Sequence, residues 1–173
     1  DKILHEFKYA KDLVKYIKSK NLGFTICVAG YPEGHPETPD LDLSLKHLKQ
    51  KVDAGADFII TQLFFDNTLF YRFVEKAREI GINIPILPGI MPSTNYKTIE
   101  KITQMCKVRI PSKIIKFFTQ KENISQEDMK KFAIDYTYKQ CLDLEKNGFS
   151  HFHFYTLNKS SVVKDVCELL LGR

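Results

Sequence analysis

A mostly apolar run ends abruptly in a polar loop between Phe24 and Glu37, and no other stretch constrains the fold as much. Residues 24–29 are apolar apart from Thr25, as expected of a strand that is covered on both faces of a parallel sheet. The next eight residues hold two glycines, two prolines, two glutamates, a tyrosine and a histidine. Since α/β folds bind their ligands beyond the carboxyl ends of the strands, this stretch predicts a buried strand that leads into a binding site.

Three further strands are expected to end in polar residues in the same way, and helical periodicity separates all four. This alternation predicts an α/β fold with a parallel sheet and right-handed crossovers. A capping-box sequence, Ser125–Asp128, is expected to open the longest helix. The predicted strands are 24–29, 57–65, 84–87 and 150–156, and the predicted helices are 2–19, 41–52, 67–80, 96–106, 112–120, 126–147 and 160–170. Pro88 and Gly89 are expected to end the third strand.

Four parallel strands fit either an open doubly wound sheet or an arc of an eight-stranded barrel. Polar residues at the ends of all four strands, and the lack of a glycine-rich phosphate loop, favour the arc. An arc leaves two unpaired edges, so we expect the other half upstream on the same polypeptide or on a second chain. The chain opens on Asp1 inside a predicted helix, which also suggests upstream residues.

The composition is that of a single soluble domain: 173 residues, 43% apolar and 27% charged. No apolar run is long enough to span a membrane, and no signal peptide is evident. Four widely spaced cysteines without a C-x-x-C pair favour a reducing, cytoplasmic compartment, with the thiols buried as small apolar groups. They are Cys27, Cys106, Cys141 and Cys167.

The net charge of +5 comes from residues 97–121, which carry seven basic residues against Glu100. Such a segment could bind nucleic acid, but its basic residues alternate with apolar ones as on the solvated side of packed helices. The solvated face is the preferred interpretation, and no nucleic-acid partner is expected.

Two polar features of the strands have competing interpretations. Gln62 lies inside an apolar strand, so its amide needs either an internal hydrogen-bond partner or a ligand. His151 and His153 share a strand face with Tyr155. Since no carboxylate or thiolate stands at ligand spacing, no metal site is predicted there.

Five blocks of this sequence resemble methylenetetrahydrofolate reductases in order and spacing. The resemblance implies that residues 1–173 form the C-terminal half of the family's (β/α)8 TIM barrel, roughly strands five to eight, with the upstream half missing from this chain. The five blocks are Ala29–Glu37, Leu48–Asp57, Ile60–Asp66, Ile86–Pro92 and His153–Asn158.

The function that the resemblance implies is the reduction of 5,10-methylenetetrahydrofolate to 5-methyltetrahydrofolate, in one-carbon metabolism and methionine biosynthesis. FAD would carry the hydride and NAD(P)H would supply it, in a homo-oligomer that includes the N-terminal half of the barrel. The residues implied for FAD are Ala29, Tyr31, His35, Pro36, Glu37, Thr38 and Lys51, and those implied for the folate substrate are Gln62, Tyr155 and Lys159.

The chain departs from the family pattern at Ser44, where an aspartate usually contacts the flavin nucleotide, and at Lys159, where an arginine usually meets the substrate. Lysine keeps the charge of arginine but loses its planar fork. The family's general-acid glutamate has no counterpart here, so no catalytic residue is assigned and the chain alone is expected to be inactive. The alternative is a catalytically inactive barrel fragment that acts as a binding or assembly module.

Overall fold

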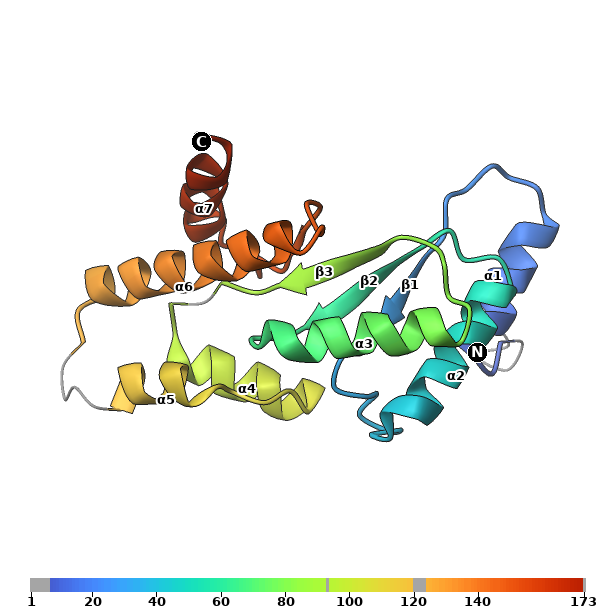
Figure 1. Ribbon diagram of the computed structural model, residues 1–173, viewed down its shortest axis with the longest axis horizontal. Helices are drawn as coiled ribbons and strands as arrows, with labels where there is room; N and C mark the ends of the chain where they lie inside the picture. Colours follow the sequence, from blue (N-terminus) through green and yellow to red (C-terminus); the bar gives the residue numbers. More distant parts are fainter. Residues whose placement is uncertain (1–6, 93, 120–123, 173) are drawn as a thin grey trace. The chain divides into compact units, whose positions relative to one another are not determined.

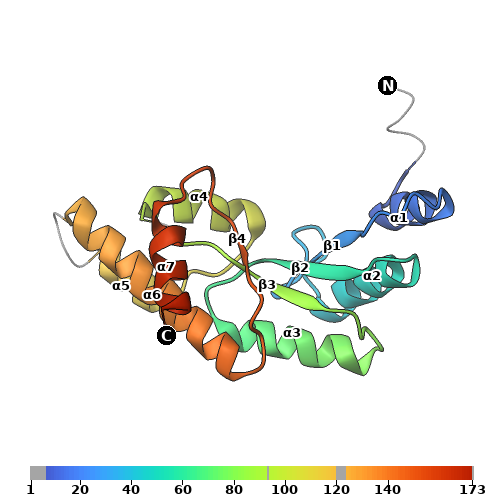
Figure 2. The same cartoon turned by 90° about the horizontal axis from the view of Figure 1, so that it is seen from above.

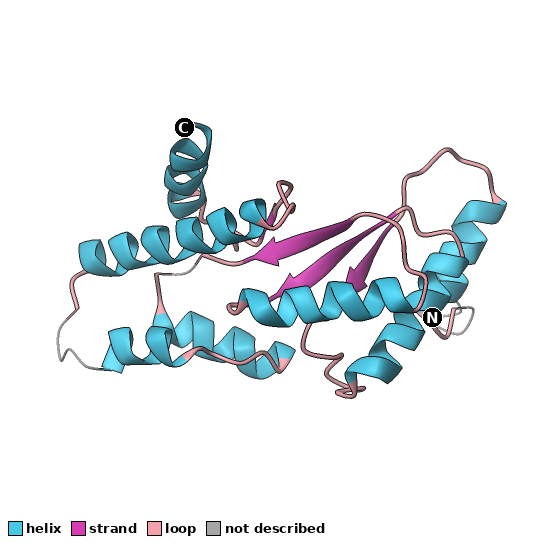
Figure 3. Cartoon of the chain, viewed as in Figure 1, coloured by secondary structure: helices cyan, strands magenta, loops and turns pink. Residues whose placement is uncertain are grey.

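A computed structural model describes residues 7–92, 94–119 and 124–172. Strands and helices alternate along the chain, which confirms the α/β class (Figures 1 and 3). The chain divides into two compact units. The first holds the residues up to Gln62 together with Tyr71–Leu87, and the second holds Leu63–Phe70 and the residues from Pro88 onward.

The strands form a parallel sheet, as the sequence predicts, and their order in it is β1-β2-β3-β4. In the first unit Cys27 pairs with Phe58, and in the second Ile90 pairs with Phe154. The strands are β1 (Cys27–Gly30), β2 (Phe58–Leu63), β3 (Ile86–Ile90) and β4 (His153–Phe154).

The expectation that the first strand is covered on both faces is wrong. Phe24 lies before the strand and is 62% exposed, and β1 begins only at Cys27. Burial alternates along β1 and β2, since helices cover one face of these strands while the other face stays exposed or half-exposed. The side chains of this open face are Cys27, Ala29, Phe58, Ile60 and Gln62.

The ends of the other two strands also differ from the prediction. Pro88 and Gly89 lie inside β3, because a proline removes only one ladder donor and the strand continues to Ile90. The fourth strand shrinks from 150–156 to His153–Phe154, although the backbone N–H of Tyr155 still donates to Ile90 at 2.8 Å.

Three helices build the first unit: α1 (Ala10–Ser19), α2 (Leu41–Asp53) and most of α3 (Asn67–Glu79). The first begins later than predicted, with Tyr9 as its N-cap, and residues 2–6 of that prediction lie outside the described residues. Apolar side chains of α2, β2 and α3 fill the core, and each buried Leu, Ile or Phe contributes about 1.5–3 kcal/mol. They include Leu45, Leu48, Ile59, Phe73 and Ala77.

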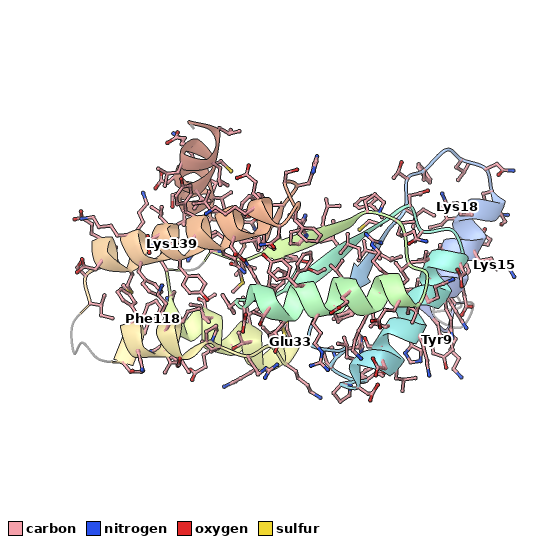
Figure 4. All side chains as sticks on the ribbon, in the orientation of Figure 1. Tyr9, Lys15, Lys18, Glu33, Phe118 and Lys139 are labelled. Atoms are coloured by element: carbon pink, nitrogen blue, oxygen red, sulfur yellow. The ribbon has the colours of Figure 1, made fainter. Side chains whose placement is uncertain are left out.

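An ion pair joins α1 to the start of the sheet in this unit. Lys18 Nζ donates to both carboxylate oxygens of Asp57, at 2.8 and 2.9 Å, and Figure 4 labels this lysine. The same carboxylate accepts from the backbone N–H of Ile26 at 2.7 Å. These contacts, with the hydrogen bond from Lys18 first, lower the pKa of Asp57.

The second unit contains the remaining helices: α4 (Tyr96–Cys106), α5 (Ser112–Thr119), α6 (Gln126–Lys146) and α7 (Ser161–Leu171). The predicted cap of α6 is confirmed, since Ser125 Oγ accepts from the backbone N–H of Asp128 at 3.0 Å. Helix α7 packs on α6 through Ala133, Val162 and Val166 (Figures 1 and 2).

The cysteine prediction holds only in part. Cys141 is fully buried, Cys106 and Cys167 are half-buried, and Cys27 is exposed on the open face of the sheet. Burial of Cys27 as a small apolar group was therefore the wrong expectation. Among the described residues, no helix combines the length and the apolar character needed to cross a bilayer.

Candidate functional site

A cavity of about 520 Å³ lies in the first unit, beside the loop that follows β1. Figure 4 labels Tyr9, just before α1, and Glu33, in the loop after β1. The cavity is lined by Lys8, Tyr9, Ala10, Lys11, Tyr31, His35, Glu37, Thr38, Ser44, His47, Leu48, Gln50, Lys51 and Phe73.

The loop after β1 holds its aromatic side chains in a fixed arrangement. The rings of Tyr31 and His35 meet edge to face, with centroids 4.6 Å apart. His35 Nδ1 accepts from the backbone N–H of Glu37 at 3.1 Å, and the carbonyl of His35 accepts from Thr38 at 2.8 Å. Because Nδ1 is an acceptor, the proton of the neutral imidazole is on Nε2, which is free of this turn and can donate to a ligand.

Gly34 makes the tight turn of this loop possible. Its φ of +88° belongs to the left-handed region, and a Cβ there would lie 2.4 Å from the carbonyl oxygen of Pro39. Only glycine fits such a position, so the sequence Tyr31–Thr38 forms this compact loop rather than an extended one.

Lys51 reaches from the last turn of α2 to the end of β1. Its Nζ donates to the carbonyl oxygen of Ala29 at 2.6 Å and lies 5.9 Å from the centroid of the Tyr31 ring. Desolvation lowers the pKa of this ammonium group. One proton of Lys51 is used by the backbone, and the other two remain for an anionic ligand at the cavity wall.

Five of the residues expected at a flavin site therefore line one cavity: Tyr31, His35, Glu37, Thr38 and Lys51. Ala29 takes part through its carbonyl group rather than its side chain. Pro36 lies in the same loop but not on the cavity wall. Ser44, the departure from the family pattern, is only 7% exposed and also lines the cavity.

Sequence reasoning missed the wall formed by α1 and by the rest of α2. Lys11 Nζ donates to Gln50 Oε1 at 2.9 Å and lies 5.6 Å from the ring centroid of Tyr9. Helical periodicity counted back from Lys51 would have found His47 on the same face of α2. No local signal could have found Lys11, because its position depends on how α1 packs on α2.

The residues expected at the substrate are distributed over both units. Gln62 belongs to the first unit, where it lies half-buried on the open face of β2. Tyr155 belongs to the second, and its ring meets that of His153 edge to face with centroids 4.7 Å apart. Lys159 is exposed there, and its N–H closes a turn onto Thr156 at 2.9 Å.

Comparison with known proteins gives one consistent family. The family model of methylenetetrahydrofolate reductase matches residues 1–171. A Saccharomyces cerevisiae relative, methylenetetrahydrofolate reductase 2, is 44% identical over 170 residues, covering 95% of this chain and 28% of its own length. The Salmonella typhimurium 5,10-methylenetetrahydrofolate reductase is 40% identical over 162 residues, covering 94% of this chain and 54% of its own length.

A solved structure from Clostridium thermocellum has a similar fold, with a TM-score of 0.61 at 16% identity over 91% of this chain and 56% of that one. Its title describes an uncharacterized protein that binds two copies of 5-methyl-5,6,7,8-tetrahydrofolic acid. The chain thus spans roughly a quarter to a half of the length of these proteins.

Proposed function

Because the chain belongs to the methylenetetrahydrofolate reductase family, we propose that it is the C-terminal half of a flavin-dependent reductase barrel. The assembled enzyme reduces 5,10-methylenetetrahydrofolate to 5-methyltetrahydrofolate in the cytoplasm. The observation that carries the proposal is the cavity beside β1, where Tyr31, His35 and Lys51 lie together.

The side chains around this cavity fit FAD. Lys8, Lys11 and Lys51 bring positive charge against the single carboxylate of Glu37, which suits a diphosphate. Tyr31 and His35 add ring faces and donors for the flavin or its ribityl chain. A bound flavin would supply the hydride-transfer chemistry, while Lys51 and His35 would hold the phosphates and hydroxyls in place.

The hydride source is a nicotinamide cofactor. Relatives of this chain are named for NADH in Arabidopsis thaliana and for NADPH in Caenorhabditis elegans. We therefore propose NAD(P)H as the co-substrate.

Three residues are proposed to bind the folate. The amide of Gln62 offers a donor and an acceptor in one plane, which matches the edge of a pterin. Tyr155 offers a ring face and a hydroxyl group. Lys159 offers a positive charge for the carboxylate of the substrate, with weaker orientation than an arginine would give.

The upstream half of the barrel is the proposed partner. The open face of β1 and β2 carries Phe58, Ile60 and Gln62 half-exposed, with Cys27 and Ala29 exposed beside them. In a closed barrel this face is the packed interior, and the neighbouring strands fill it. The same upstream half would supply the general acid, so this chain alone would carry binding residues for FAD and folate but would not reduce the substrate. Assembly into a homo-oligomer remains part of the proposal.

The test is to express the chain alone and together with an upstream half, taken from its own reading frame or from the Salmonella relative. Flavin absorbance and NAD(P)H-dependent reduction of 5,10-methylenetetrahydrofolate are then measured. We expect both only in the assembled protein. Turnover by the isolated chain would refute the half-barrel, and an assembled protein that stays free of flavin would favour the binding or assembly module.

A further inference from the structure

A second cavity, of about 360 Å³, lies within the second unit, and none of the residues proposed for FAD or folate lines it. It is lined by the segment that follows β2, the start of α5 and one face of α6. The lining residues are Phe65, Asp66, Asn67, Thr68, Pro111, Lys113, Tyr136, Lys139, Gln140 and Asp143. The volume falls in the range of small-molecule sites, at its lower end.

The amide of Asn67 has a fixed orientation in this cavity wall. Its Nδ2 donates to the carbonyl oxygen of Gln140 at 3.0 Å and to Asp143 Oδ2 at 2.7 Å. Both partners are acceptors, so the nitrogen and the oxygen of the amide cannot be exchanged. The buried Oδ1 of Asn67 then has no donor within the part of the chain that the structure describes.

The amide and hydroxyl donors next to Asn67 already donate to other acceptors. Gln140 Nε2 donates to the carbonyl of Phe64 at 3.0 Å, and the hydroxyl of Tyr136 donates to that of Phe65 at 2.7 Å. Thr68 uses both its N–H and its hydroxyl on Asp66 Oδ1. A buried acceptor without a partner is costly, so a donor from outside these segments is expected at Asn67.

The charged groups around the cavity indicate a ligand that carries charges of both signs. Asp66 and Asp143 provide two carboxylates, and Lys113 and Lys139 provide two ammonium groups. Lys113 Nζ lies 5.7 Å from the ring centroid of Tyr136. Lys139 pairs with Asp135 at 2.6 Å, but both groups are more than half exposed, so this pair is weak and can be exchanged.

We propose that this cavity binds a free α-amino acid, with the ligand's ammonium group on Asn67 Oδ1 between Asp66 and Asp143, and its carboxylate toward Lys113 and Lys139. A zwitterion satisfies the buried acceptor and both pairs of charges at once. A simple cation would make no use of the ammonium groups of Lys113 and Lys139, and a simple anion would leave the buried Oδ1 of Asn67 without a donor. This site goes beyond the proposed reductase function and does not depend on it.

The experiment uses the full-length polypeptide that carries this chain. Each of the standard L-amino acids is titrated individually and followed by two-dimensional NMR or calorimetry. For any amino acid that binds, the matching decarboxylated amine and deaminated acid are titrated as probes of each charge. We expect saturable binding of at least one amino acid, and at least about tenfold weaker binding of its amine and its acid.

Variants then locate the site. Lys113→Met should weaken binding about three- to tenfold. Lys116 is also an exposed lysine on α5 but does not line the cavity, so Lys116→Met should leave binding unchanged. Asn67→Ala should weaken it about tenfold or more, with folding checked by circular dichroism. The proposal is overturned if no amino acid binds saturably, or if binding survives both Lys113→Met and Asn67→Ala. Flavin binding and reductase activity do not enter either readout.

Discussion

At the scale of single residues, Lys51 is the side chain on which the proposed flavin site depends most. It is held between the Ala29 carbonyl and the Tyr31 ring, at the end of a strand and in a partly desolvated position. A lysine placed for packing alone would not need its ammonium group next to an open cavity. The geometry therefore favours an anionic partner.

Lys51→Met should weaken FAD binding about tenfold or more in the assembled protein, because it removes a charge-assisted hydrogen bond. Flavin fluorescence during titration measures this. Lys49→Met is the matched control, since Lys49 lies on the same helix, pairs with Asp53 and does not line the cavity. Equal losses in the two variants would contradict the assignment.

Gly30 shows why a small residue ends β1. A Cβ at this position would lie 2.8 Å from Cζ of Phe73 and 2.9 Å from Cγ2 of Ile59. Gly30→Ala should therefore destabilise the fold by about 1–3 kcal/mol through overpacking, as measured by urea unfolding. When Phe73→Leu is combined with Gly30→Ala, the double variant should lose less unfolding free energy than the sum of the losses in the two single variants. Strict additivity would show that the contact is not responsible.

At the scale of elements, α6 has a cap that α7 lacks. Ser125 accepts a hydrogen bond from Asp128, whereas Ser160, the N-cap of α7, makes no side-chain cap bond. Ser125→Ala should cost about 0.5–2 kcal/mol of unfolding free energy, and Ser160→Ala should cost much less. Thermal unfolding of both variants compares the two helix ends directly. Equal losses would mean that the cap of α6 contributes nothing.

Tyr136 connects α6 to the segment after β2 and gives this contact a pH dependence. Burial, with the charge of Asp66 as the lesser cause, raises the pKa of Tyr136 to about 12. An unfolded tyrosine ionises near pH 10. The buried neutral phenol therefore contributes its full stability below about pH 10, and this contribution is lost as the pH rises toward 12.

In a pH titration followed by tyrosinate absorbance, Tyr136 should ionise at a higher pH than an exposed tyrosine, in a separate late phase. Tyr136→Phe should remove the late phase, whereas Tyr16→Phe, an exposed control on α1, should leave it in place. If the late phase persists in the Tyr136→Phe variant, the assignment of this phase to Tyr136 is wrong.

At the scale of the whole molecule, the open face of the sheet is the feature that requires a partner. Cys27 is exposed on this face, and in a closed barrel the upstream strands would cover it. We expect iodoacetamide to label Cys27 in the isolated chain and to label it much more slowly after the upstream half is added. Mass spectrometry of the Cys27 peptide measures this, with the fully buried Cys141 as an unlabelled control. Unchanged labelling of Cys27 would contradict the barrel.

Much of this architecture was predictable, because it depends on local periodicity. The helix over 96–106 and the Ser125 cap follow from spacing and capping residues alone, and both are confirmed. Strand ends were less predictable: Pro88 and Gly89 suggested a stop, but the sheet continues through them to Ile90. Local propensity is a weak guide wherever neighbouring strands decide the pairing.

The candidate site also has features that the sequence predicts and features that depend on tertiary contacts. The sequence by itself determined the alternation of strands and helices, the family and the polar loop from Tyr31 to Thr38, because these depend on residues close together in the chain. Only the tertiary structure decided that α1 brings Lys11 to the cavity beside this loop, that Cys27 lies on the open face of the sheet, and that Asn67 has a buried oxygen without a donor among the described residues. Such features depend on contacts between segments far apart in the chain, and a local pattern carries no record of them.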